Sequence, residues 1–213
     1  MLYTVIATPR SGSSSLCGLV SAQYNAKNLG EVFFPFYGRR KKDCVYKDKI
    51  LKLIEASKKK DIVVKILVNK TDYMSQDTIK LLLHNSQKLF YSIRLDHIAQ
   101  VKSMLAGKQT RKFGKRKSIN ETITIKITGD DMESNGTKML EYIRKQGQWY
   151  KEFPGELCIL DHWGNEPYVS CYDFNITKSI KEFLNPMTVR YIDREFDILS
   201  IFHEGDINSS LIN

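Results

Sequence analysis

Short β-branched runs alternate with helix-like segments along this chain, and that alternation restricts its fold more than any other feature. Strands are predicted over Leu2–Ala7, Asp61–Val68 and Lys88–Leu95, because these runs are short, apolar and rich in β-branched or aromatic residues. Helices are predicted over Asp48–Ser57, Gln76–His84 and His97–Gly107. Strands that alternate with helices indicate βαβ units, so we predict an α/β fold with a parallel β-sheet flanked by helices.

The remaining segments have less regular patterns. Glycine and proline among aromatic residues predict a structured loop over Asn28–Gly38. A strand-like alternation covers Glu121–Thr128, and a helical pattern covers Thr137–Phe153. Two apolar segments, 156–160 and 168–172, flank a Gly-Asn turn, and a last helix is predicted from Thr177, with that residue as its N-cap.

The length of 213 residues suits one sizeable core, so we predict a single domain over residues 1–213 with a frayed polar tail at 206–213. The four cysteines lie far apart without a C-x-x-C pair, which favours reduced thiols and predicts neither a zinc site nor another metal site. No apolar run reaches membrane-spanning length, and the N-terminus enters a strand directly. We therefore predict a cytoplasmic protein that has no membrane partner.

A net charge of +9 favours an anionic partner, which could be a nucleic acid, a phosphorylated cofactor or an anionic surface. The basic runs Arg39–Lys42 and Lys58–Lys60 are interpreted as solvated faces. The segment Arg111–Ser118, RKFGKRKS, is the strongest basic candidate for phosphate contacts, but it is poor in the aromatic residues that stack on bases. A nucleic acid is therefore not the partner that we favour.

The segment PRSGSSS at residues 9–15 lies between the first strand and a helix. Leu16, Leu19 and Val20 recur at helical spacing after it, so the segment is predicted to form a loop at a helix N-terminus. Unpaired backbone N–H groups and the helix dipole make that position suitable for phosphate or sulfate. A nucleotide-binding P-loop would need G-x-x-x-x-G-K-[ST], whereas here Arg10 precedes a run of serines. Such a loop can hold an anion without a metal ion.

This loop resembles the 5′-phosphosulfate loop of the sulfotransferases, PRSGST. A second segment, LFYSIRLDHIAQVKSMLAGKQT at 89–110, resembles the strand, arginine, helix and serine unit by which that family binds the 3′-phosphate of 3′-phosphoadenosine 5′-phosphosulfate (PAPS). Between them, LGEVFF at 29–34 resembles the loop that carries the glutamate base of the bacterial trehalose sulfotransferases. The resemblance implies a P-loop-like sulfotransferase fold and PAPS as the cofactor.

The resemblance also implies roles for individual residues. The 5′ side of PAPS would be bound by Arg10, Ser11, Gly12, Ser13, Ser14 and Ser15. Arg94 and Ser103 would bind the 3′-phosphate, and Arg10 would also stabilise the charge that develops on the leaving phosphate. Glu31 is the candidate general base, with His97 as a competing one. Val32 stands where the trehalose type has tyrosine, so we predict a hydroxyl of a carbohydrate or another small metabolite as the acceptor and do not assign trehalose.

Two alternatives from other classes remain open at this point. The chain could be a basic nucleic-acid-binding protein that uses Arg111–Ser118, which predicts binding with a steep salt dependence. It could instead be a nucleotide kinase with an altered phosphate loop, which predicts affinity for ATP and dependence on magnesium. The sequence assigns no oligomeric state.

Overall fold

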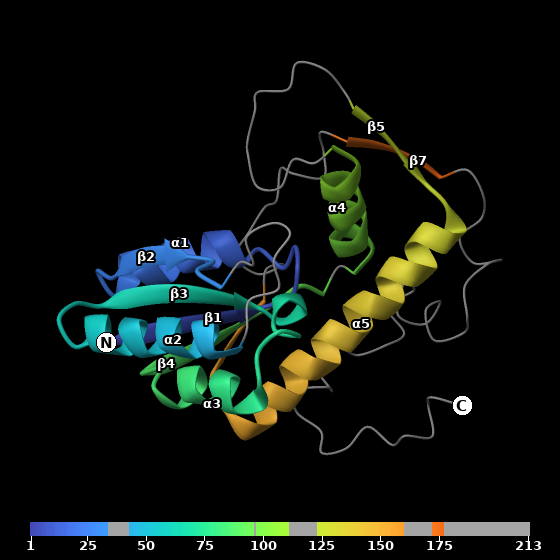
Figure 1. Ribbon diagram of the computed structural model, residues 1–213. Coiled ribbons are helices and arrows are strands. Elements are labelled where there is room, and N and C mark those ends of the chain that lie inside the picture. Colours follow the sequence, from blue (N-terminus) through green and yellow to red (C-terminus); the bar gives the residue numbers. More distant parts are fainter. Residues whose placement is uncertain (34–42, 96, 111–122, 160–171, 177–213) are drawn as a thin grey trace. The chain divides into compact units, whose positions relative to one another are not determined.

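The computed structural model describes residues 1–33, 43–95, 97–110, 123–159 and 172–176 (Figure 1). The chain divides into two compact units. Unit 1 comprises Met1–Ile93 and Lys145–Leu160, and unit 2 comprises Arg94–Arg144 and Asp161–Asn213. The single domain over residues 1–213 stays a prediction.

Unit 1 is built on a five-stranded sheet in which every neighbouring pair of strands is parallel. Its strands are β1 (Leu2–Ala7), β2 (Lys27–Gly30), β3 (Ile62–Leu67), β4 (Lys88–Ile93) and β6 (Glu156–Ile159). The strand order is β2-β3-β1-β4-β6, which leaves β1 in the centre. This arrangement confirms the predicted α/β fold with a parallel sheet.

Helices connect and cover these strands. Those of unit 1 are α1 (Ser13–Gln23), α2 (Asp43–Ser57), α3 (Gln76–His84), the 3₁₀ turn η1 (Val68–Lys70) and the last part of α5 (Gly129–Glu152). Helix α1 packs against β1, β2 and β3, whereas α2 packs against α3 and β1. The crossovers through α1 and α2 run in opposite directions across the sheet, so right-handed connections put these two helices on opposite faces.

The core of unit 1 is centred on β1, whose six residues are all buried. The strand has partners on both sides, and helices cover both faces of the sheet, so it reads as a continuous apolar run. Tyr3 stacks on Tyr24 from the C-terminal end of α1, with ring centroids 4.4 Å apart. The loop that follows Ala7 therefore starts from the central, fully buried strand of the sheet.

Unit 2 contains α4 (His97–Thr110), the first part of α5, and a pair of parallel strands, β5 (Ile123–Ile127) and β7 (Tyr172–Ile176). The start of α5 is closed by a reciprocal pair of hydrogen bonds. The Asp131 N–H donates to Thr128 Oγ1 over 3.1 Å, and the Thr128 N–H donates to Asp131 Oδ2 over 3.2 Å. This capping box explains why α5 begins eight residues before the predicted Thr137.

Several predictions from the sequence are corrected by the structure. The predicted loop Asn28–Gly38 begins as strand β2, which sequence periodicity missed because an exposed edge strand needs no apolar alternation. Helix α2 starts at Asp43, earlier than the predicted Asp48, with an acidic residue in its first turn. Leu19 is 53% exposed and does not belong to the buried stripe of α1.

Of the two apolar segments near the C-terminus, the first forms β6, which pairs with β4 in unit 1. Only Tyr172 of the segment 168–172 belongs to the described residues, and it begins β7, which pairs with β5 in unit 2. The Gly164-Asn165 turn, the helix predicted from Thr177 and the tail at 206–213 lie outside the described residues.

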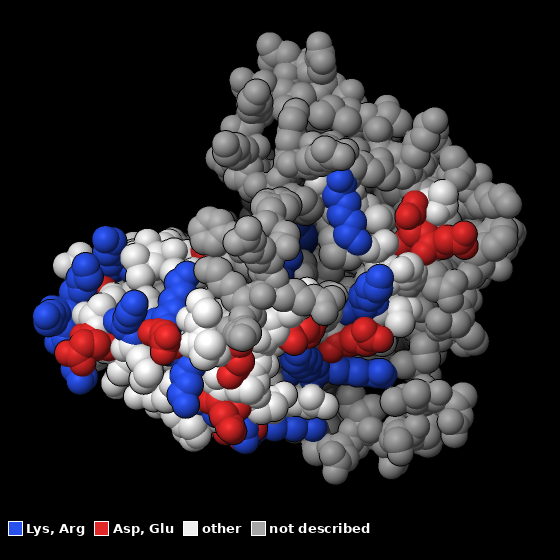
Figure 2. Space-filling view, in the orientation of Figure 1, with Lys and Arg blue, Asp and Glu red and all other residues white. Residues whose placement is uncertain are grey.

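The surface of unit 1 carries charges of both signs. Lys and Arg side chains alternate with Asp and Glu over the face that Figure 2 shows. Lys58–Lys60 are exposed, which confirms their interpretation as a solvated face, and Arg39–Lys42 lie outside the described residues. Among the described helices, none is both long enough and apolar enough to cross a bilayer.

Candidate anion-binding site

The candidate site of unit 1 lies at the carboxyl ends of the strands, in the loop between β1 and α1. From β1 the chain leads to β2 on one side of the sheet, whereas β4 leads to β6 on the other side. When the chain runs from two neighbouring strands to opposite sides of the sheet, a crevice forms at the carboxyl ends of these strands. Many α/β proteins bind their ligands in such a crevice. The sheet order alone therefore selects this loop as a binding position.

The loop backbone has an uncommon conformation. Arg10 has φ 64° and Gly12 has φ 77°, so two residues of the loop lie in the left-handed region. Glycine adopts that region freely, but an arginine there costs about 1–2 kcal/mol relative to the right-handed conformation. Such strain is typical of ligand-binding segments, where the surrounding structure holds it in place.

The N-terminus of α1 has no side-chain cap among the described residues. Gly12, which has no side chain, is its N-cap, and its first turn has no acidic residue. The N–H groups of Ser15 and Leu16 both donate to the Gly12 carbonyl, over 3.0 and 3.1 Å. No residue in the described part of the chain accepts a hydrogen bond from the N–H groups of Gly12, Ser13 and Ser14. Outward N–H groups and the positive end of the helix dipole suit a phosphate or sulfate group.

A buried lysine, Lys65, reaches this loop from the middle of β3. Its residue is 8% exposed, and its Nζ donates to Ser14 Oγ over 3.0 Å. The same ammonium forms an ion pair with Glu31, with Nζ and Oε2 3.7 Å apart. A buried lysine needs such partners because burial removes its hydration. Lys65 thus adds a positive charge beside the open N-terminus.

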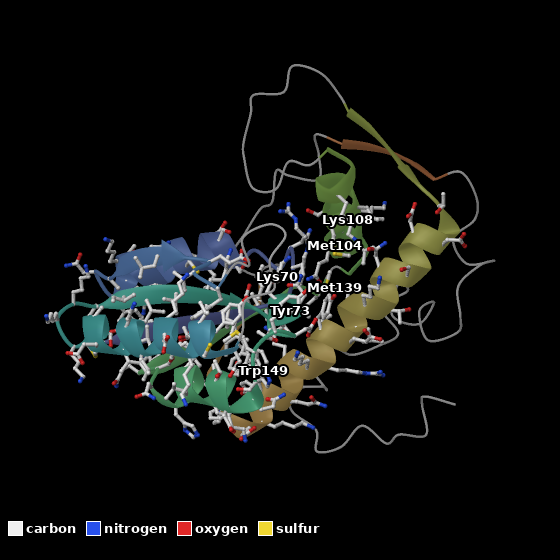
Figure 3. The ribbon with its side chains drawn as sticks, in the orientation of Figure 1. Lys70, Tyr73, Met104, Lys108, Met139 and Trp149 are labelled. Carbon is white, nitrogen blue, oxygen red and sulfur yellow. The ribbon has the colours of Figure 1, made fainter. Side chains whose placement is uncertain are left out.

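The sequence predictions did not include Lys65, although the sequence pattern around this residue is unusual. It is the only charged residue inside the apolar run IVVKILV, where an ordinary buried strand would carry none. Lys70 lies in the turn that follows the same strand, where Figure 3 labels it, and its charge acts on Glu31. Both lysines thus come from one strand and the turn after it.

Glu31 follows directly after β2, on the neighbouring edge of the sheet. Its side chain is 22% exposed, and its Oε1 is buried without a hydrogen-bond partner in the described structure. Burial raises the pKa of this carboxyl above its ordinary value of 4.5, while Lys65 and Lys70 act in the opposite direction. A carboxylate with a raised pKa and an oxygen without a hydrogen-bond partner among the described residues is suited to accept a proton.

The structure brings together the predicted site residues that belong to unit 1. Arg10 and Ser11–Ser15 form the loop, and Lys65 connects the loop to Glu31. Within the loop the serine hydroxyls differ: Ser14 and Ser15 are exposed, whereas Ser11 is fully buried and uses its hydroxyl inside the unit.

The other predicted residues belong to unit 2. Arg94 follows β4 and is 7% exposed, and Ser103 lies in α4 and is 4% exposed. Their contact with a 3′-phosphate stays a prediction. The side chain of His97 and the basic segment Arg111–Ser118 lie outside the described residues. No group of three or more His, Cys, Asp or Glu that could hold a metal ion occurs in the part of the chain that was described.

Comparison with known proteins adds little to this site. No family model matches the chain, and no curated protein matches its sequence. The chain is similar to the crystal structure of shikimate kinase from Bacteroides thetaiotaomicron, with 8% identity and a TM-score of 0.44, over 80% of this chain and 92% of that one. A likeness at this level supports no inference about function, so the site rests on its own geometry.

Proposed function

We propose that this protein is a sulfotransferase that moves a sulfuryl group from PAPS to a hydroxyl of a carbohydrate or another small metabolite. The observation that carries the proposal is the loop at Arg10–Ser15, which joins two left-handed residues to an uncapped helix N-terminus beside a buried lysine. Its sequence also resembles the 5′-phosphosulfate loop of that family.

The residues of the loop fit the 5′ side of this cofactor. When bound, PAPS supplies an activated sulfuryl group whose transfer leaves negative charge on the 5′-phosphate. The N–H groups of Gly12–Ser14 and the Arg10 guanidinium are donors for that phosphate, and Lys65 adds a positive charge through its contact with Ser14. Fixed donors at the atom where charge develops make a large electrostatic contribution to a transfer reaction.

Glu31 is proposed to accept the proton of the acceptor hydroxyl. A hydroxyl is a poor nucleophile until its proton is removed, and a carboxylate of raised pKa removes it more effectively near neutral pH than an ordinary one. Lys65 would keep Glu31 charged and near the loop through the ion pair. Arg94 and Ser103 are proposed to bind the 3′-phosphate, on the resemblance alone.

The first test is calorimetric titration with 3′-phosphoadenosine 5′-phosphate (PAP), the desulfated product, in EDTA. Adenosine 5′-phosphate and ATP are titrated beside it, with wild type, Arg10→Ala and Lys59→Ala. Lys59 is exposed, so its substitution removes one positive charge away from the loop. We expect micromolar binding of PAP that needs the 3′-phosphate, weakens in Arg10→Ala and is retained in Lys59→Ala. Equal binding of all three nucleotides, or no binding, would overturn the proposal.

The same titrations separate the alternatives. Preference for ATP, together with a requirement for magnesium, would indicate a nucleotide kinase. Binding of a nucleic acid with a steep salt slope, in the absence of nucleotide binding, would indicate a nucleic-acid-binding protein.

A further inference from the structure

We propose that Ser11, Ser92 and Gln146 are positioning residues that hold the β1–α1 loop in its anion-binding shape. This inference rests on the proposed function of the loop and goes beyond it, because none of the three side chains needs to touch the ligand. All three are buried: Ser11 and Ser92 have no exposed area, and Gln146 is 1% exposed.

The two serines join the loop to β4. The Ser11 hydroxyl lies 3.0 Å from the Thr8 carbonyl oxygen and 3.2 Å from Ser92 Oγ, and it can donate to either. The Ser92 hydroxyl donates in turn to the Ser11 carbonyl over 2.6 Å. A hydroxyl has one proton and two lone pairs, so this pair of residues satisfies both side chains and one loop carbonyl.

Gln146 connects the start of the loop to two strands of the sheet through hydrogen bonds. Its Nε2 donates to the Ile6 carbonyl over 2.9 Å and to the Ser92 carbonyl over 3.2 Å. These carbonyls belong to β1 and β4, the two strands that flank the crevice. The amide thus links the ends of both strands at the point where the loop begins, using the two donors that one amide nitrogen carries.

The network explains how an arginine is kept in the left-handed region. The contact from Ser11 Oγ to the Thr8 carbonyl closes the short turn that contains Arg10, and Ser92 holds the far end of that turn. Because these groups are buried, each of these bonds is expensive to break, since it leaves a buried polar group without its partner. Without the network the turn would relax toward ordinary backbone angles and would move the N–H groups away from an anion.

The test compares two variants of equal size at Ser92. Ser92→Thr keeps the hydroxyl, Ser92→Val replaces it with a methyl group, and both add the same branched volume to a strand. PAP affinity is measured by calorimetry, and thermal stability is measured on the same samples. We expect Ser92→Val to bind PAP about tenfold more weakly than Ser92→Thr. Equal affinities in the two folded variants would overturn the inference.

A matched hydroxyl elsewhere in the unit separates positioning from stability. Ser86 Oγ and Thr4 Oγ1 lie 2.7 Å apart, and Ser86 Oγ also donates to the Leu82 carbonyl over 2.8 Å, at a position before β4 that does not touch the loop. Ser86→Ala should lower the melting temperature and leave PAP affinity unchanged. A fall in PAP affinity in Ser86→Ala equal to that in Ser92→Val would overturn the positioning role. Absence of PAP binding in wild type would instead reject the proposed function.

Discussion

Helices α1 and α3 begin in opposite ways, although both starts are rich in hydroxyl residues. At α3, Ser75 is the N-cap, and its hydroxyl accepts from the Thr78 N–H over 3.2 Å. The Asp43 carboxylate closes the same end: it accepts from the Ser75 N–H over 2.6 Å and from the Ser75 and Thr78 hydroxyls over 2.9 Å each. The hydrogen bonds from Ser75 hold the pKa of Asp43 below its usual range. An anion from the protein itself thus sits at the start of α3.

At α1 the local serines do not perform this role. Four serines surround Gly12, yet no side chain of the described residues caps the helix, and no acidic residue lies in its first turn. One serine cap stabilises a helix by about 1 kcal/mol. Helix α1 lacks this contribution, although serines are present at its start. The comparison shows that the open end of α1 is a property of the loop conformation and not of its composition.

The largest expected effect is that of removing the cation beside the open end. Arg10→Ala should lower kcat of PAPS-dependent transfer about a hundredfold, because it removes a fixed charge from the leaving phosphate. Arg10→Gly removes the same charge and also relieves the left-handed backbone, so it should be equally inactive but more stable than Arg10→Ala. Kinetics and thermal melts measure both effects, and an active Arg10→Gly would contradict the role of the side chain.

The next effect is that of the buried lysine. Lys65→Met should weaken PAP binding about tenfold, since it removes the ammonium that contacts Ser14. It should also raise the pKa of Glu31 further, because Lys65 opposes the effect of burial, and so shift the pH profile of activity upward. Lys52→Met, on the exposed surface of α2, is the control. An unshifted pH profile would show that the ion pair does not act on the base.

At the closed end, Asp43→Ala should reduce stability by about 1 kcal/mol without changing PAP affinity. The sign of the pH dependence follows from the lowered pKa: the contribution of Asp43 is present above its ordinary value of 3.8 and is lost as the pH falls through the lowered value. Urea unfolding at several pH values measures this, with Asp48→Ala as a control on the same helix. Equal losses in both variants would mean that the contacts of Asp43 with α3 contribute nothing.

The smallest expected effect is on stability at Glu31. Because its pKa is raised in the folded protein, its ionisation opposes folding, and stability should fall as the pH rises from 4.5 through the raised value. Glu31→Gln removes this ionisation, so the variant should gain stability relative to wild type across that range and lose the gain at lower pH. A difference that is independent of pH would show that burial of the charge is not its cause.

The parts of this protein that sequence reasoning predicted are those with local causes. The predicted bounds of β1, a short run of β-branched and aromatic residues, match the structure, and so do those of α3, which begins after a serine N-cap. The loop at Arg10–Ser15 was selected as a candidate site because its residue types fit an anion, and its position between β1 and α1 matches the structure. In contrast, the pairing of β2 as an edge strand and of β6 with β4 depends on contacts between distant segments, which periodicity does not contain.

The sequence by itself determined a parallel α/β fold and the place of the loop, because a buried strand followed by a short polar loop and a helix is a local pattern. Only the tertiary structure decided that the end of α1 stays open, that Lys65 reaches it, and that Ser92 and Gln146 hold it from β4 and α5. These residues lie tens of positions from the loop in the chain. Their roles depend on hydrogen bonds between buried polar groups. The packing of the sheet against its helices determines which of these groups lie within hydrogen-bond distance.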